Sequence, residues 1–235
     1  MFKRVFWLNG LAIVAVVCSH AVVWGETAMT WWANRWQMVS VPYDWDATLP
    51  YYAFLIIQRL AHFSVPAFLF FSGFFLSYAA SGSASSVSWK MVRTRVQTIM
   101  IPFLIWSAVS IAWGLLEGKS YAPIYLATAL LLGWPVGLLL WYPPVICFFY
   151  SISPFLYRLA RARPILLLII AGLLHLTVVS YEYLRLGLYF VGINLGSYDA
   201  ILPRHFVMLI WFVLGLLAGV YRREFASRLK GRAWH

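Results

Sequence analysis

Residues 5–25 read VFWLNGLAIVAVVCSHAVVWG, an apolar stretch of about the length that crosses a lipid bilayer as a helix. The stretch contains no Asp, Glu, Lys or Arg, and its most polar side chains are Asn9 and His20. A helix satisfies its own backbone hydrogen bonds in lipid, and the alternating pattern of a barrel strand is absent. The stretch therefore predicts a transmembrane helix.

The composition extends this interpretation to the whole chain. Of its 235 residues, 63% are hydrophobic and only 11% are charged, whereas a soluble domain is about 25% charged. A soluble protein of this size cannot hide so much apolar surface, and a disordered chain needs few aromatics and a high charge density. The sequence therefore predicts an all-α, polytopic bundle of transmembrane helices.

Five further stretches are long and apolar enough to be spans, which makes about six in total. The six candidates are Val5–Gly25, Ala61–Ala80, Val96–Leu116, Leu138–Tyr157, Pro164–Tyr181 and His205–Tyr221.

The basic residues fix the orientation of these spans. With the N-terminus inside, thirteen of the 18 Lys and Arg residues fall in cytoplasmic segments and five in outer ones. Because cytoplasmic loops carry the excess of Lys and Arg, both termini are expected in the cytoplasm. The net charge of +11 is therefore explained by topology and not by nucleic-acid binding.

The remaining segments are assigned to loops and to short membrane-associated pieces. Residues 26–58 are expected to form an aromatic-rich outer loop, either an interfacial belt or a platform for a sugar. Tyr121–Pro135 and Leu186–Leu195 are too short to span and are expected to be interfacial or re-entrant. Without internal repeats, residues 1–235 are expected to form a single membrane-embedded domain. Its two cysteines, both inside spans, give no disulfide framework.

His20 is the strongest candidate for chemistry. It lies about 22 Å along the first span, in the outer half of the membrane, where ionisable groups are rare and usually face the interior of the bundle. A neutral imidazole can take a proton from a hydroxyl near pH 7. The structural alternative is a histidine bonded to a neighbouring helix. Asn9 stands eleven residues earlier and thus on the same helix face.

Two other groups of polar residues are candidates for binding. Lys90, Arg93 and Arg95 precede the third span on the cytoplasmic side, where they suit phosphates or simply follow the positive-inside rule. Candidates for the outer, acceptor side are Glu182, Asp199 and His205, which are also explained as solvated loop ends. The sequence shows no zinc, haem, nucleotide or dinucleotide motif, so no metal or bound cofactor is expected.

Five motifs in the same order resemble acyltransferase family 3, the integral-membrane O-acyltransferases. They are Asn9–Ile13 with Ser19–Ala21, Val65–Phe74, Ile101–Ser107, Leu140–Tyr142 with Ser153–Leu156, and Trp211–Gly215. The resemblance covers essentially the whole chain.

The resemblance implies transfer of an acyl group, often acetyl, from cytoplasmic acyl-CoA to a hydroxyl outside, commonly on a cell-surface saccharide. By position, His20 matches the family's catalytic histidine, as general base or transient acyl carrier. Arg95, with Arg93 and Lys90 beside it, matches the start of the donor-binding Arg-x-x-Arg pair. The implied location is a multi-pass position in a cell membrane, with a bacterial inner membrane favoured.

The chain departs from the family pattern at two charged positions and in its number of spans. Asn9 stands where the family usually has Arg or Lys, and Thr98 stands at the second arginine of the pair. The family has about ten spans, so its C-terminal spans are expected to be missing here. The alternative hypothesis is therefore a non-catalytic membrane protein on the same scaffold, such as a polysaccharide export or assembly partner. A transporter is the third hypothesis, although no matched halves are visible.

Overall fold

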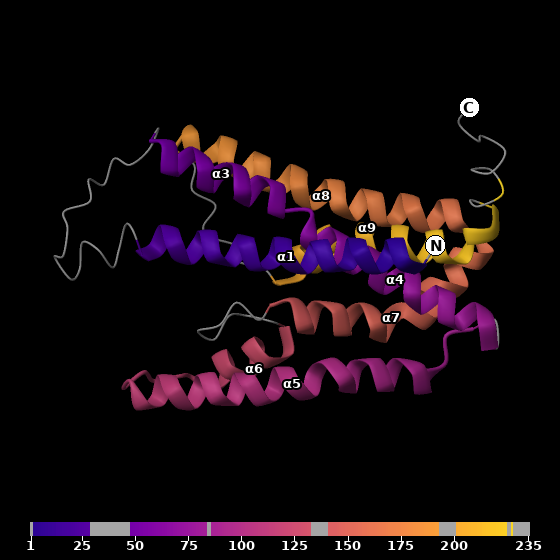
Figure 1. Cartoon of the computed structure of the whole chain (residues 1–235), viewed down its shortest axis with the longest axis horizontal. Coiled ribbons are helices and arrows are strands. Elements are labelled where there is room, and N and C mark those ends of the chain that lie inside the picture. Colours follow the sequence, from indigo (N-terminus) through magenta and orange to yellow (C-terminus); the bar gives the residue numbers. More distant parts are fainter. Residues whose placement is uncertain are drawn as a thin grey trace. The chain divides into compact units, whose positions relative to one another are not determined.

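The computed structural model describes residues 2–28, 48–83, 86–132, 141–192, 201–224 and 227. Within these ranges the regular structure is helical, as the sequence predicts (Figure 1). The helices are α1 (Phe2–Thr27), α3 (Leu49–Ala61), α4 (Ser64–Ser83), α5 (Trp89–Leu116), α6 (Pro123–Leu132), α7 (Tyr142–Ala162), α8 (Pro164–Phe190) and α9 (Ile201–Val220).

The chain divides into two compact units, Met1–Phe71 and Ser72–His235. In the first unit, α1 and α3 pack side by side and run in opposite directions (Figure 1). The buried positions of α1 include Ala12, Ala15 and Val22. A Cβ placed on Gly25 of α1 would lie 3.4 Å from the ring of Phe54 on α3, an ordinary van der Waals distance. The two helices are therefore in direct contact at this position.

The second unit is organised around α7, which packs against α5, α6, α8 and α9. Val145, Ile146 and Phe149 of α7 are almost fully buried. The ring of Phe149 lies 5.4 Å, centroid to centroid, from the ring of Phe212 on α9, and Tyr150 meets the same ring edge-on at 6.1 Å. These aromatic contacts form the centre of the unit's core.

Helices α4 and α9 approach closely at two glycines. A Cβ placed on Gly73 of α4 would collide with the carbonyl oxygen of Phe212 and lie 2.8 Å from the amide nitrogen of Leu216. One turn further along α4, Ser77 lies directly against Gly219, and its hydroxyl donates to the Phe74 carbonyl at 2.9 Å. A Ser-Gly pair in an aromatic stretch, such as Ser72-Gly73, allows a neighbouring backbone to approach closely, as α9 does at Gly73.

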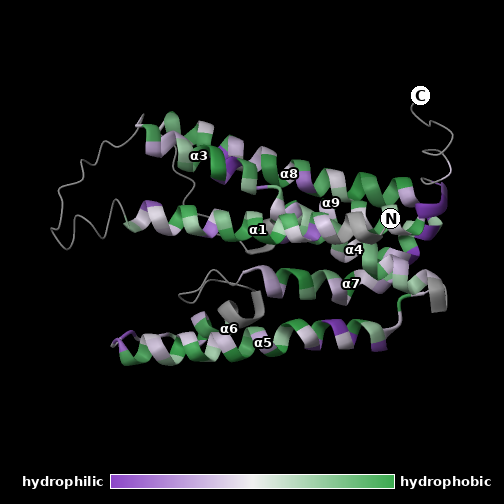
Figure 2. Cartoon of the chain, viewed as in Figure 1, coloured by the Kyte–Doolittle hydropathy of each residue, from purple (hydrophilic) through white to green (hydrophobic). Residues whose placement is uncertain are grey.

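The outer surfaces of the helices are apolar, as Figure 2 shows by the green residues along α5 and α8. Ile105, Trp106 and Trp113 of α5 are all well exposed. By length and composition, four helical segments of the described chain can cross a membrane, and a shorter apolar helix covers His205–Val220. The four are Trp7–Thr27, Leu49–Ser81, Trp89–Leu116 and Pro164–Leu188.

Two expectations about the outer segments are corrected. Residues 49–58 belong to helix α3 and not to a loop, because Thr48 caps the helix by accepting from the Tyr51 amide and Pro50 fits its first turn. Leu186 and the following residues to Phe190 are not a separate interfacial piece, because α8 continues unbroken to Phe190. The expected outer loop between 29 and 47 lies outside the described residues.

The end of α5 and the short helix α6 agree with the expectation that the segment beginning at Tyr121 is too short to span the membrane. Helix α5 ends at Leu116, and Gly118 two residues later has a φ of +81°, in the left-handed region that glycine tolerates. Just before it, the Glu117 carboxylate accepts from Lys119 Nζ and from Trp113 Nε1, both at 2.7 Å, and these bonds lower the pKa of Glu117. At 10 residues, or about 15 Å, α6 is too short to cross a membrane.

The contact between α4 and α9 predicts a large difference between two glycine substitutions. Gly73→Ala forces a methyl group into the α9 backbone, and overpacking of this kind typically costs about 1–3 kcal/mol. Gly172→Ala in α8 is the matched control, because a Cβ there meets nothing within 4 Å and alanine favours helix. We expect the thermal unfolding midpoint in lipid nanodiscs to fall for Gly73→Ala and to stay or rise for Gly172→Ala. Equal midpoints for the two variants would contradict the described packing.

Candidate functional site

His20 lies in α1, in the first unit, seven residues before the helix ends at Thr27. Its side chain is partly buried, as is that of Asn9. Because α1 is continuous from Phe2, the eleven-residue spacing puts both side chains on one face, about 16 Å apart. The helix thus carries two polar groups at different depths of the same face, as the sequence predicts.

The three basic residues at the start of α5 differ in how far the protein buries them. Ser88 caps the helix by accepting from the Met91 amide at 3.3 Å, which fixes where the basic turn begins. Lys90 and Arg93 are exposed, whereas Arg95 is partly buried. In this cluster, Arg95 is therefore the side chain held most firmly by the protein.

Tyr150 of α7 is the partner that holds Arg95. Arg95 Nη1 donates to the Tyr150 hydroxyl at 3.5 Å, and the guanidinium carbon lies 5.5 Å from the centre of the ring. This combines a long hydrogen bond with a cation–π contact. Tyr150 is not predictable as this partner from the sequence, because it stands 55 residues away in an apolar span. Only the packing of α5 against α7 brings the two residues together.

Thr98, the uncharged position of the Arg-x-x-Arg pattern, is exposed one turn further along α5. Its hydroxyl donates to the Thr94 carbonyl at 2.8 Å, within the same helix. The side chain is therefore satisfied locally and supplies no positive charge.

The three candidates for the acceptor side fall in different environments. His205 of α9 is only 4% exposed, and Phe148 and Phe149 meet its ring edge-on with centroid distances of 5.0 and 6.4 Å. The backbone of Glu182 lies inside α8 and not at a loop end, since the helix continues for eight more residues. Asp199 lies outside the described residues. Of these three side chains, the structure describes only that of His205.

His175 is a polar residue of α8 that sequence reasoning did not select. Its Nδ1 lies 2.8 Å from the Val207 carbonyl oxygen of α9, which matches a hydrogen bond that joins the two helices. A histidine in an apolar span can thus contact a neighbouring helix, so intramembrane position by itself does not identify a catalytic group.

The structure does not bring the histidine and the basic cluster into one compact unit. His20 belongs to the first unit, and Lys90, Arg93 and Arg95 belong to the second. Among the described residues, no three His, Cys, Asp or Glu side chains lie close enough together to hold a metal ion.

Comparison with known proteins identifies the family. No curated protein and no solved structure gave a significant match. The family model described as an acyltransferase domain matches residues 5–234, a range that contains His20, the basic cluster and parts of both units. The chain therefore belongs to acyltransferase family 3 and is an acyltransferase by that membership.

Proposed function

We propose that this acyltransferase moves an acyl group, typically acetyl, from cytoplasmic acyl-CoA to a hydroxyl of an extracytoplasmic acceptor such as a cell-surface saccharide. The observation that carries the proposal is the family match over residues 5–234. The sequence resemblance implies that His20 is the catalytic histidine of this family. The product on a saccharide is an O-acetylated polymer. We further propose that residues 1–235 act as one domain in a cell membrane, with a bacterial inner membrane favoured.

The proposed topology has six crossings, with both termini in the cytoplasm. It assigns one crossing each to α1, α4, α5, α7, α8 and α9. In the second unit, α4, α7 and α9 end where α5 and α8 begin (right in Figure 1). That end carries the basic residues Lys90, Arg93, Arg95, Arg158, Arg161, Arg163, Arg222 and Arg223. This clustering supports a cytoplasmic location for that end.

The proposed reaction uses His20 as the general base. The acceptor oxygen attacks the thioester carbonyl carbon, and its proton passes to the His20 imidazole as the new C–O bond forms. The C–S bond then breaks, and the thiolate of CoA leaves and takes up a proton. A partly buried imidazole in the outer half of the first span suits an acceptor that approaches from outside.

The donor is proposed to bind at the basic start of α5. Tyr150 holds the Arg95 guanidinium in place, so that its planar fork can face a phosphate of CoA with little loss of side-chain freedom. The exposed Lys90 and Arg93 add attraction for the same phosphates from a distance. Because Arg95 is held in place and its neighbours are exposed, we expect Arg95 to contribute more to binding of acyl-CoA than Lys90 or Arg93.

The acceptor side is proposed to include Glu182, Asp199 and His205. The buried position of His205 against Phe148 and Phe149 suits a role in positioning and not direct contact with the acceptor. Carboxylates such as Glu182 and Asp199 accept hydrogen bonds from sugar hydroxyls.

A second candidate function is a non-catalytic partner in polysaccharide export or assembly. It is favoured by the uncharged Asn9 and by Thr98, whose hydroxyl is bonded within its own helix. The two functions differ in acyl-CoA-dependent transfer, which the next experiment measures.

We predict that His20→Ala lowers transfer from labelled acetyl-CoA, in membranes that contain the chain, by about 100-fold or more, since general bases contribute 10²–10⁴-fold. The control is His62→Ala, which changes an exposed histidine whose ring is bonded to the Gln58 carbonyl beside it.

Undiminished transfer in His20→Ala would remove His20 from the mechanism. Absence of transfer in the unchanged chain would favour the non-catalytic function. Label retained on the protein without acceptor would indicate an acyl carrier instead of a base.

The same assay tests the basic cluster. We expect Arg95→Gln to raise the KM for acetyl-CoA about tenfold, which corresponds to one lost charge-assisted hydrogen bond to phosphate. Tyr150→Phe removes the hydroxyl that accepts from Arg95 and should raise the KM by a smaller factor. Lys90→Gln is the matched control, because its side chain is exposed. An equal rise in KM for Arg95→Gln and Lys90→Gln would show that only the overall charge matters.

A further inference from the structure

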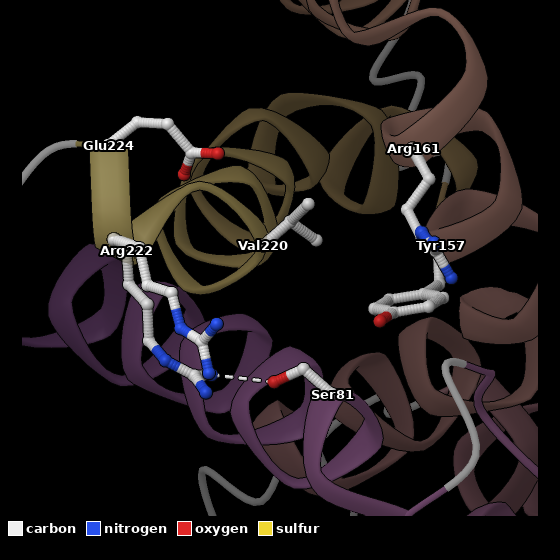
Figure 3. Close-up of a pocket in the computed structure, with 7 residues that line it drawn as sticks. Ser81, Tyr157, Arg161, Val220, Arg222 and Glu224 are labelled. Carbon is white, nitrogen blue, oxygen red and sulfur yellow. Dashed lines mark hydrogen bonds between the residues drawn. The ribbon is translucent and has the colours of Figure 1, made fainter.

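A pocket of about 250 Å³ opens at the basic end of the second unit, and sequence reasoning did not identify it. Three segments that are far apart in the chain form its walls (Figure 3). Its polar lining consists of Ser81 from α4, Tyr157 and Arg161 from α7, and Arg222, Arg223 and Glu224 from the turn after α9. None of these residues belongs to the Lys90–Arg95 cluster.

The charge of the lining favours an anion. Three arginines and one glutamate give a formal charge of +2. The Glu224 carboxylate forms no ion pair with Arg222 or Arg223 in the part of the chain that the structure describes. A ligand with one or two negative charges therefore matches the pocket.

The guanidinium of Arg222 is fixed before any ligand arrives. Its carbon lies 4.2 Å from the centre of the Tyr78 ring, and its Nη1 donates to Ser81 Oγ at 2.6 Å (Figure 3). A guanidinium has five N–H donors in a rigid plane, so the bond to Ser81 leaves further donors for a ligand. Because the ring and the serine hold the group in place, binding costs little side-chain entropy.

Figure 3 shows Tyr157 on the side of the pocket opposite Arg222, with its ring directed inward and Arg161 beside it. Cations and a phenolic hydroxyl on facing walls can contact different oxygens of one tetrahedral anion. The volume lies below the 300–1,000 Å³ of pockets that enclose drug-sized ligands, which favours one phosphate with a short attached segment.

We propose that this pocket binds the phosphate group of an organic phosphate at the cytoplasmic face. Two sources offer this chemistry there, namely the phosphates of coenzyme A and the headgroup of an anionic phospholipid. The proposal goes beyond acyl transfer, because phosphate binding requires only Arg222 and its neighbours.

The test uses the full chain in nanodiscs of phosphatidylcholine alone. One arm adds increasing coenzyme A, and the other replaces increasing fractions of the lipid, up to a fifth, by phosphatidylglycerol. Each arm measures the rise in the thermal unfolding midpoint and the Kd derived from its concentration dependence. Arg222→Gln changes the fixed cation, and Arg158→Gln is the matched control, an exposed arginine of α7 outside the pocket lining.

We expect Arg222→Gln to weaken binding of one probe about tenfold, and Arg158→Gln to change it less than twofold. Dependence on Arg222 in the coenzyme A arm identifies the nucleotide as the source, and dependence in the lipid arm identifies the headgroup. If Arg222→Gln does not fold, Arg223→Gln takes its place.

The proposal is overturned if neither probe stabilises the unchanged chain, or if Arg158→Gln weakens binding as much as the pocket variants. Loss of transfer in His20→Ala leaves this result unaffected, so the two proposals fail separately.

Discussion

The direct backbone contact between α4 and α9 is the constraint on which the second unit depends. In lipid, burial of apolar side chains gives little drive for helices to associate, so close van der Waals packing of small residues must supply it. Gly73 and Ser77 lie one turn apart and meet Phe212, Leu216 and Gly219. A side chain at Gly73 would push the two backbones apart and remove the dispersion contacts along the whole crossing.

The contact between α4 and α9 also helps to position two arginines, Arg222 and Arg95. Ser81 lies one turn beyond Ser77 on the same face of α4, and there it accepts from Arg222. The ring of Phe212 on α9 also packs against Tyr150, which holds Arg95 of α5. The polar contacts at the basic end therefore depend on an apolar core, and a small displacement of α9 would shift two cationic groups together.

The sequence predicted what depends on local composition and missed what depends on contact between distant segments. The apolar helices and the close packing at Gly73 were predictable from hydrophobic length and small residues. The many aromatic residues between 26 and 58 favour a loop and hide helix α3, although Thr48 and Pro50 are typical of a helix N-terminus. The pairing of Arg95 with Tyr150, and the pocket, join residues more than fifty positions apart, which periodicity alone does not reveal.

The cations gathered at the basic end bear on the absence of an arginine at Thr98. Phosphate binding requires cationic donors at the right place, and it does not matter which helix supplies them. The Thr98 hydroxyl is bonded within its own helix and leaves no buried polar group unsatisfied. Helix α5 therefore accommodates threonine at this position without cost to the fold. At the same end of the unit, Arg222 is already fixed by Tyr78 and Ser81. A charge absent from one helix is thus compatible with phosphate recognition when the bundle gathers cations from its other helix ends.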